Sequence, residues 1–141
     1  MTKVTAPLDL DAAYPRVQLF YAAQLRMLDE LDVQGYAATF TPDAEFAHTP
    51  GQPPARTRGG ILAELIEAAR RFATDPVQRR HWVNMIHLTP ADDGALISHA
   101  YCLVVKIRPG QQPTFVSCVM HDVLVEGDAG LLTRSRVIEY D

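Results

Sequence analysis

The segment LDELDVQGYAATFTPDAEF, residues 28–46, separates a helical half of the chain from a half rich in strand-forming residues. Before it, apolar residues recur at three- and four-residue steps from Asp11 to Leu31, which predicts an amphipathic helix. Inside the segment, the Asp32 carboxylate can accept free amide protons, so a second helix is predicted over 33–40. The proline that follows ends this helix, since proline cannot continue one.

After this segment one more helix is predicted, and the remaining elements are strands. A short strand is expected over 45–49, and Gly59 and Gly60 open a third helix predicted over 61–73. The rest of the chain consists of strand-like stretches separated by turn residues. These four predicted strands cover residues 80–88, 95–107, 114–125 and 131–140.

Three helices followed by four strands predict an α+β fold with helices on one face of an antiparallel sheet. Strands of this length twist, so the sheet is expected to curve around the first helix and leave a conical pocket. The chain has 141 residues, the size of one ordinary domain. We expect residues 1–12 to form a flexible leader and residues 13–141 to form a single domain.

The composition is that of an ordinary folded protein, with 48% hydrophobic and 21% charged residues. The net charge of −4 and the scattered arginines argue against nucleic-acid binding. No apolar stretch is long enough to cross a membrane, and the first residues contain no apolar signal region. A cytoplasmic protein is therefore expected. Cys102 and Cys118 lack metal or redox spacing, which predicts two buried, reduced thiols.

The sequence offers no motif for a metal or a cofactor. His81 and His87 lie too far apart on one strand to share an ion readily, and no carboxylate or cysteine stands at matching spacing. Dinucleotide, P-loop and nucleophile-elbow motifs are all missing from the sequence. We therefore predict no metal ion and no cofactor.

Residues 28–46 resemble the entry segment of the SnoaL-like branch of the nuclear transport factor 2-like superfamily. One difference is Val33, where that branch usually has tryptophan. The resemblance covers residues 14–141 in the same order of elements. Three further stretches carry it: RHWVN at 80–84, HDVL at 121–124 and RSRVI at 134–138.

The resemblance implies a cone-shaped sheet wrapped around three helices, a homodimer and a hydrophobic small-molecule substrate. It also implies that Asp29 and His81 correspond to the acid–base pair of the dehydratase members. The Asp29 carboxylate would hold the His81 imidazole in one tautomer, and an imidazole titrates near neutral pH. The alternative is a surface aspartate and a core histidine without a catalytic role.

Four further side chains are predicted to bind substrate. By the resemblance, His48 and His121 correspond to a tyrosine and an asparagine in the pocket of scytalone dehydratase, and either could donate to a carbonyl oxygen. Tyr101 offers a flat ring and a hydroxyl, although strand parity does not decide which face it occupies. Tyr21 lies two helical turns before Asp29 on the stripe expected to face the sheet.

The leading hypothesis is a cofactor-independent enzyme of secondary-metabolite or antibiotic biosynthesis. It would dehydrate, cyclise or isomerise a polyketide-like or polycyclic intermediate through an enol or enolate. The first alternative is a non-catalytic ligand-binding or accessory subunit similar to the β subunit of ring-hydroxylating dioxygenases. A lower-ranked alternative is an epoxide hydrolase or cyclase, with Asp122 as a second carboxylate.

Two arginine pairs flank the third predicted helix, at 70–71 and 79–80. Such charges are most often solvated, and near the end of a helix they interact favourably with its dipole. A functional alternative is a clamp for an anionic substrate, such as a carboxylate, phosphopantetheine or coenzyme A.

Overall fold

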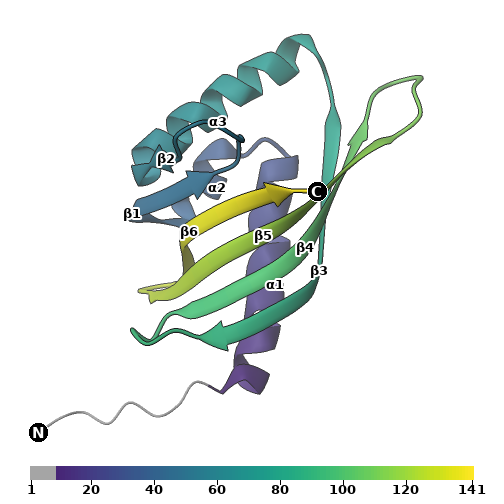
Figure 1. The fold of residues 1–141 in the computed structure, drawn as a ribbon. Helices are drawn as coiled ribbons and strands as arrows, with labels where there is room; N and C mark the ends of the chain where they lie inside the picture. Colours follow the sequence, from purple (N-terminus) through teal and green to yellow (C-terminus); the bar gives the residue numbers. More distant parts are fainter. Residues whose placement is uncertain (1–8) are drawn as a thin grey trace, which may run out of the picture.

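The computed structural model describes residues 9–141, in which helices lead into a curved, unclosed sheet (Figure 1). The predicted α+β class is confirmed. The helices are α1 (Leu10–Asp29), α2 (Val33–Ala38) and α3 (Thr57–Thr74). The strands are β1 (Phe40–Ala47), β2 (Ala55–Arg56), β3 (Gln78–Pro90), β4 (Leu96–Ile107), β5 (Thr114–Gly127) and β6 (Gly130–Tyr140), in the order β2-β1-β6-β5-β4-β3.

Helix α1 begins earlier than the sequence predicted. Asp9 is its N-cap, and the Asp9 carboxylate accepts hydrogen bonds from the amides of Asp11 and Ala12 at 3.0 and 3.3 Å. Residues 9–12 were assigned to the flexible leader, and this part of the prediction is wrong. The remainder of that leader, residues 1–8, lies outside the described residues.

The second helix is shorter than predicted, and the strand after it is longer. Helix α2 ends at Ala38, and β1 already begins at Phe40, which is fully buried. Strand β1 continues through Pro42, because its register with β6 shifts between Phe40 and Glu45 and proline is tolerated at such irregularities. The pairing of β1 with β6 is parallel, the exception in an otherwise antiparallel sheet.

Helix α1 packs across one face of the sheet, here called the inner face, and the opposite face is the outer face (Figure 1). Every second residue of β4, from Leu96 to Val104, is buried on the inner face. The core joins apolar side chains of α1, α2 and the sheet, among them Val17, Leu25, Phe40, Ala100, Met120 and Leu124.

A buried ion pair lies at the centre of this core. Arg136 of β6 donates from Nε and Nη2 to the two carboxylate oxygens of Asp122 on β5, at 2.9 and 2.7 Å. Both side chains are almost completely buried. Arg136 also donates to the hydroxyl of Tyr36 on α2 at 2.9 Å and to the side-chain oxygen of Gln24 on α1 at 2.7 Å. One guanidinium therefore ties two strands to two helices.

We predict that Arg136→Met lowers the free energy of unfolding by about 3–5 kcal/mol, because it leaves the Asp122 carboxylate buried without its partner. Urea denaturation followed by circular dichroism measures this loss. The matched control is Arg134→Met on the same strand, whose exposed pair with Asp93 contributes about 0–1 kcal/mol. Equal losses in the two variants would contradict the structural role of the buried pair.

Candidate active site

The end of α1 and the start of β3 bring Asp29 and His81 together. The Nδ1 atom of His81 lies 2.5 Å from Oδ1 of Asp29. The backbone N–H of His81 donates to the other carboxylate oxygen at 3.1 Å. Both side chains are largely buried, with 10% and 9% of their surface exposed. The carboxylate thus holds the ring and the backbone of His81 at the same time.

This arrangement selects one tautomer of the imidazole. A carboxylate accepts hydrogen bonds and does not donate them, so the nitrogen facing it carries the proton. The proton therefore resides on Nδ1 of His81, and Nε2 keeps a lone pair. A histidine held in this way can accept a proton through Nε2 and later return it, which is the behaviour of a general base and acid.

His81 lines a small chamber of about 60 Å³ on the inner face. Cys102 and Cys118 also line it, and both are buried and free, as the sequence predicted. Burial raises the pKa of the Cys102 thiol to about 12, so at neutral pH it is uncharged. Because the thiolate is the nucleophilic form, the chamber favours acid–base chemistry over covalent attack by sulfur.

Tyr36 brings a hydroxyl to the same chamber. Its oxygen accepts the hydrogen bond from Arg136, and burial raises the pKa of the phenol above its ordinary value. Within residues 9–141, no side chain accepts a hydrogen bond from this hydroxyl. Tyr36 is only 1% exposed, so its hydroxyl is a buried, protonated group beside the chamber.

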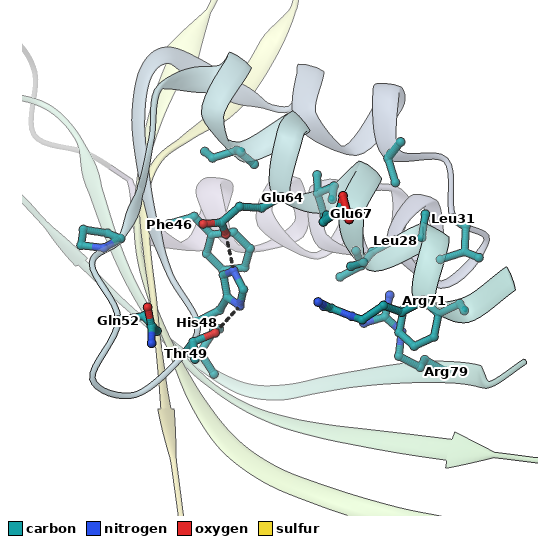
Figure 2. A pocket seen from close by; sticks show the side chains of 18 of the residues that line it. Leu28, Leu31, Phe46, His48, Thr49, Gln52, Glu64, Glu67, Arg71 and Arg79 are labelled. Carbon is teal, nitrogen blue, oxygen red and sulfur yellow. Dashed lines mark hydrogen bonds and ion pairs between the residues drawn. The ribbon is translucent and has the colours of Figure 1, made fainter. Parts of the chain in front are cut away.

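A much larger cavity, here called the main cavity, adjoins the chamber and has a volume of about 660 Å³ (Figure 2). It lies between α3, the loop after β1 and the sheet. Its size falls in the usual range for small-molecule sites. Phe46, Ile138 and Tyr140 line both spaces, so a ligand in the main cavity lies beside the chamber. Further apolar walls come from Leu28, Leu31, Ile61, Leu65 and Phe72.

Polar side chains stand on two sides of the main cavity. On one side, Nε2 of His48 lies 2.7 Å from a carboxylate oxygen of Glu64, and its Nδ1 lies 3.2 Å from the Thr49 hydroxyl. On the other side are Arg71 and Arg79 (Figure 2). The sequence predicted a pocket position for His48, and the residue does line the main cavity.

Tyr21 lines a pocket of about 380 Å³ together with Asp29 and His81, but its hydroxyl is engaged by the protein itself. The hydroxyl donates to Oδ2 of Asp122 at 2.8 Å and shares a second hydrogen bond of 2.8 Å with Ser98. Tyr21 is therefore part of the buried network around Arg136. Both oxygens of Asp122 are also engaged there, so this carboxylate is not free to activate water, as the epoxide hydrolase alternative requires.

Tyr101 and His121 lie on the outer face, away from Asp29 and His81. Tyr101 is 63% exposed, whereas its neighbours Ala100 and Cys102 are buried on the inner face. The predicted placement of both residues in the pocket is therefore wrong. The physical reason is strand alternation, because small residues occupy the inner positions against the helix and the larger ring projects outward. His121 pairs instead with His99, with 2.6 Å between their Nδ1 atoms.

Sequence reasoning gave little weight to Arg79 and none to Tyr36, which line the main cavity and the chamber. Arg79 was interpreted mainly as solvated charge, although it precedes His81 by two residues and therefore shares its strand face. That spacing was the available signal. Tyr36 had no such signal, because its role depends on a contact with Arg136, 100 positions further along the chain.

Two features are absent from residues 9–141. No helix in this part of the chain is long and apolar enough to cross a membrane. No group of three histidine, cysteine, aspartate or glutamate side chains there is arranged to hold a metal ion.

Several solved structures are similar to the chain over nearly its whole length. ActVI-ORFA from Streptomyces coelicolor is 44% identical, with 92% of this chain and 98% of that chain covered and a TM-score of 0.85. A protein from Catenulispora acidiphila in complex with S-DNPA is also 44% identical, with coverages of 93% and 95% and a TM-score of 0.83. Aln2 from a Streptomyces species is 35% identical, with coverages of 99% and 95% and a TM-score of 0.82. Among curated protein sequences, none matches the chain.

The fold is that of the nuclear transport factor 2-like group, and its curved sheet and helices enclose a cavity. The SnoaL-like domain matches residues 12–137. The chain therefore belongs to the SnoaL-like family, which includes polyketide cyclases and scytalone dehydratases.

Proposed function

We propose that this protein is a cofactor-independent enzyme that dehydrates, cyclises or isomerises a polyketide-like intermediate, with His81 as general base and acid. The observation that carries the proposal is the hydrogen bond between Asp29 and Nδ1 of His81 beside a ligand-sized cavity. The ligand's rings occupy the main cavity, and the edge that reacts extends into the chamber. The complex of a 44% identical relative with S-DNPA supports a small molecule as ligand.

In a dehydration, Nε2 of His81 removes a proton from the carbon next to a ketone, and the electron pair forms an enolate. The hydroxyl of Tyr36 donates a hydrogen bond to the enolate oxygen, where negative charge develops. The enolate then expels the hydroxyl on the β carbon, and His81 returns the proton to it as water leaves. Asp29 is a positioning residue that keeps the imidazole in the productive tautomer.

We predict that His81→Ala lowers kcat by about 10²–10⁴-fold on a β-hydroxytetralone, whose dehydration yields a naphthol, because the general base is removed. Asp29→Asn lowers kcat by about 10²-fold or more and changes KM little, because the amide does not fix the imidazole in one tautomer while its oxygen can still accept the backbone N–H of His81. Naphthol formation is followed by fluorescence.

His87→Ala is the matched control, since His87 is an exposed histidine on the same strand and its loss leaves kcat unchanged. Full turnover by His81→Ala would contradict the acid–base pair. A wild-type protein that binds such ketones but turns over none of them would favour the non-catalytic binding or accessory role.

We further propose that the protein is a homodimer formed through its outer face. Large apolar side chains are exposed along this face, among them Trp82 at 66%, Tyr101 at 63% and Phe115 at 63%. Trp82 lies opposite Leu103 in the β3–β4 pairing, so their side chains are adjacent. A contiguous apolar patch of this kind is typical of a protein–protein contact.

We predict that Trp82→Glu and Tyr101→Glu together convert the dimer to a monomer, because each introduces a charge into an apolar contact. Light scattering coupled to size-exclusion chromatography measures the mass. Leu19→Glu is the control, since Leu19 is 74% exposed on α1 and stays outside the contact. A wild-type protein with the mass of one chain, 15.6 kDa, would refute the dimer.

A further inference from the structure

Arg79 is a half-buried cation in the wall of the main cavity. Among the side chains of residues 9–141, none forms an ion pair or a hydrogen bond with its guanidinium. Other arginines of the fold have such partners, for example Arg108 with Asp75 and Arg136 with Asp122. The Asp29 carboxylate lies close enough to favour its charge but is already bonded to His81, so an anionic group of a ligand is the partner that this guanidinium still lacks.

The position of Arg79 is well defined by its surroundings. Its guanidinium stacks over the ring of Phe72 on α3, with 4.6 Å from the central carbon to the ring centroid. Burial lowers the pKa of Arg79 from its ordinary value, although the group stays charged at neutral pH. Arg71, one helical position before Phe72, also lines the cavity (Figure 2).

The carboxylates at the cavity already have partners. Glu64 lies 2.7 Å from His48, and Glu67 accepts a hydrogen bond from Arg70 at 3.1 Å. Neither therefore neutralises the arginine side of the cavity. Figure 2 shows His48 and Glu64 on the side opposite Arg71 and Arg79. The main cavity thus has an apolar middle and a positive end.

We infer that the main cavity selects an aromatic ligand bearing a carboxylate, and that Arg79 binds this carboxylate. A planar guanidinium matches a carboxylate through two parallel hydrogen bonds, which a neutral ester cannot accept with equal strength. This inference rests on the proposed function in one respect, that the main cavity is the substrate site.

The strand geometry connects the carboxylate to the reacting group. Arg79 and His81 are alternate residues on one face of β3, so their Cα atoms are about 6.6 Å apart. A ligand anchored at Arg79 is thereby held with its rings against Phe72 and its far edge toward the chamber. Arg79 acts as a specificity-determining residue that orients the ligand for His81.

The test compares the binding of naphthoate with that of its methyl ester by isothermal titration calorimetry. The wild-type protein is expected to bind the acid about 10-fold or more tightly than the ester. Arg79→Gln weakens binding of the acid by a similar factor and leaves the ester unchanged, which also shows that the variant is folded. Arg134→Gln is the matched control, since Arg134 is an exposed arginine that pairs with Asp93 and does not line the main cavity, and both affinities stay at the wild-type value.

Equal affinities of the wild-type protein for acid and ester would overturn the inference, as would an acid preference that survives Arg79→Gln. Arg79-dependent binding of coenzyme A without binding of naphthoate would also overturn it. Arg79 would then bind a phosphate of coenzyme A and not the carboxylate of an aromatic ligand. The acid preference is also measured in His81→Ala, where it is expected to persist. A failure of the acid–base proposal is thus distinguishable from a failure of carboxylate recognition.

Discussion

The buried pair of Arg136 and Asp122 is the interaction on which the rest of the structure depends. Burial alone disfavours a charged guanidinium, but the Asp122 carboxylate and the two phenols beside it raise the pKa of Arg136 well above its ordinary value. Each N–H of the guanidinium that meets Asp122, Tyr36 or Gln24 fixes one neighbouring element. A buried charge of this kind is tolerated only when all its partners are present, so the pair enforces one arrangement of α1, α2, β5 and β6.

The site follows from that arrangement. Helix α1 is held on the inner face by Gln24 and Tyr21, and its last residue, Asp29, therefore meets β3 at His81. The same network places the buried Tyr36 side chain beside the chamber. Structural polar groups and reacting groups are thus parts of one connected system, which explains why so few side chains can perform the proposed chemistry without a cofactor.

Much of the fold could be predicted from the sequence, because apolar periodicity and turn residues are local signals. The pairing of Asp29 with His81 was expected from the family resemblance, and the two side chains do meet, whereas their catalytic role stays a proposal. It was harder to predict which face of the sheet each strand residue occupies. In β3 the inner positions switch from odd to even numbers where the register shifts between Asn84 and His87, near Met85 with its φ of +53°. Local sequence patterns do not predict such a bulge. They also do not predict a contact between residues far apart in the sequence, such as Arg136 and Tyr36.

In the proposed mechanism, Asp29 holds His81 with the proton on Nδ1 and leaves Nε2 free for the ligand. Long-range proton–nitrogen NMR on the folded protein, with the ring assigned by its loss in His81→Ala, reads the tautomer directly. The account predicts a protonated Nδ1 and a bare Nε2 for neutral His81, and a mixture of tautomers in Asp29→Asn. A proton on Nε2 in the wild-type protein, or a tautomer that does not respond to Asp29→Asn, would contradict it.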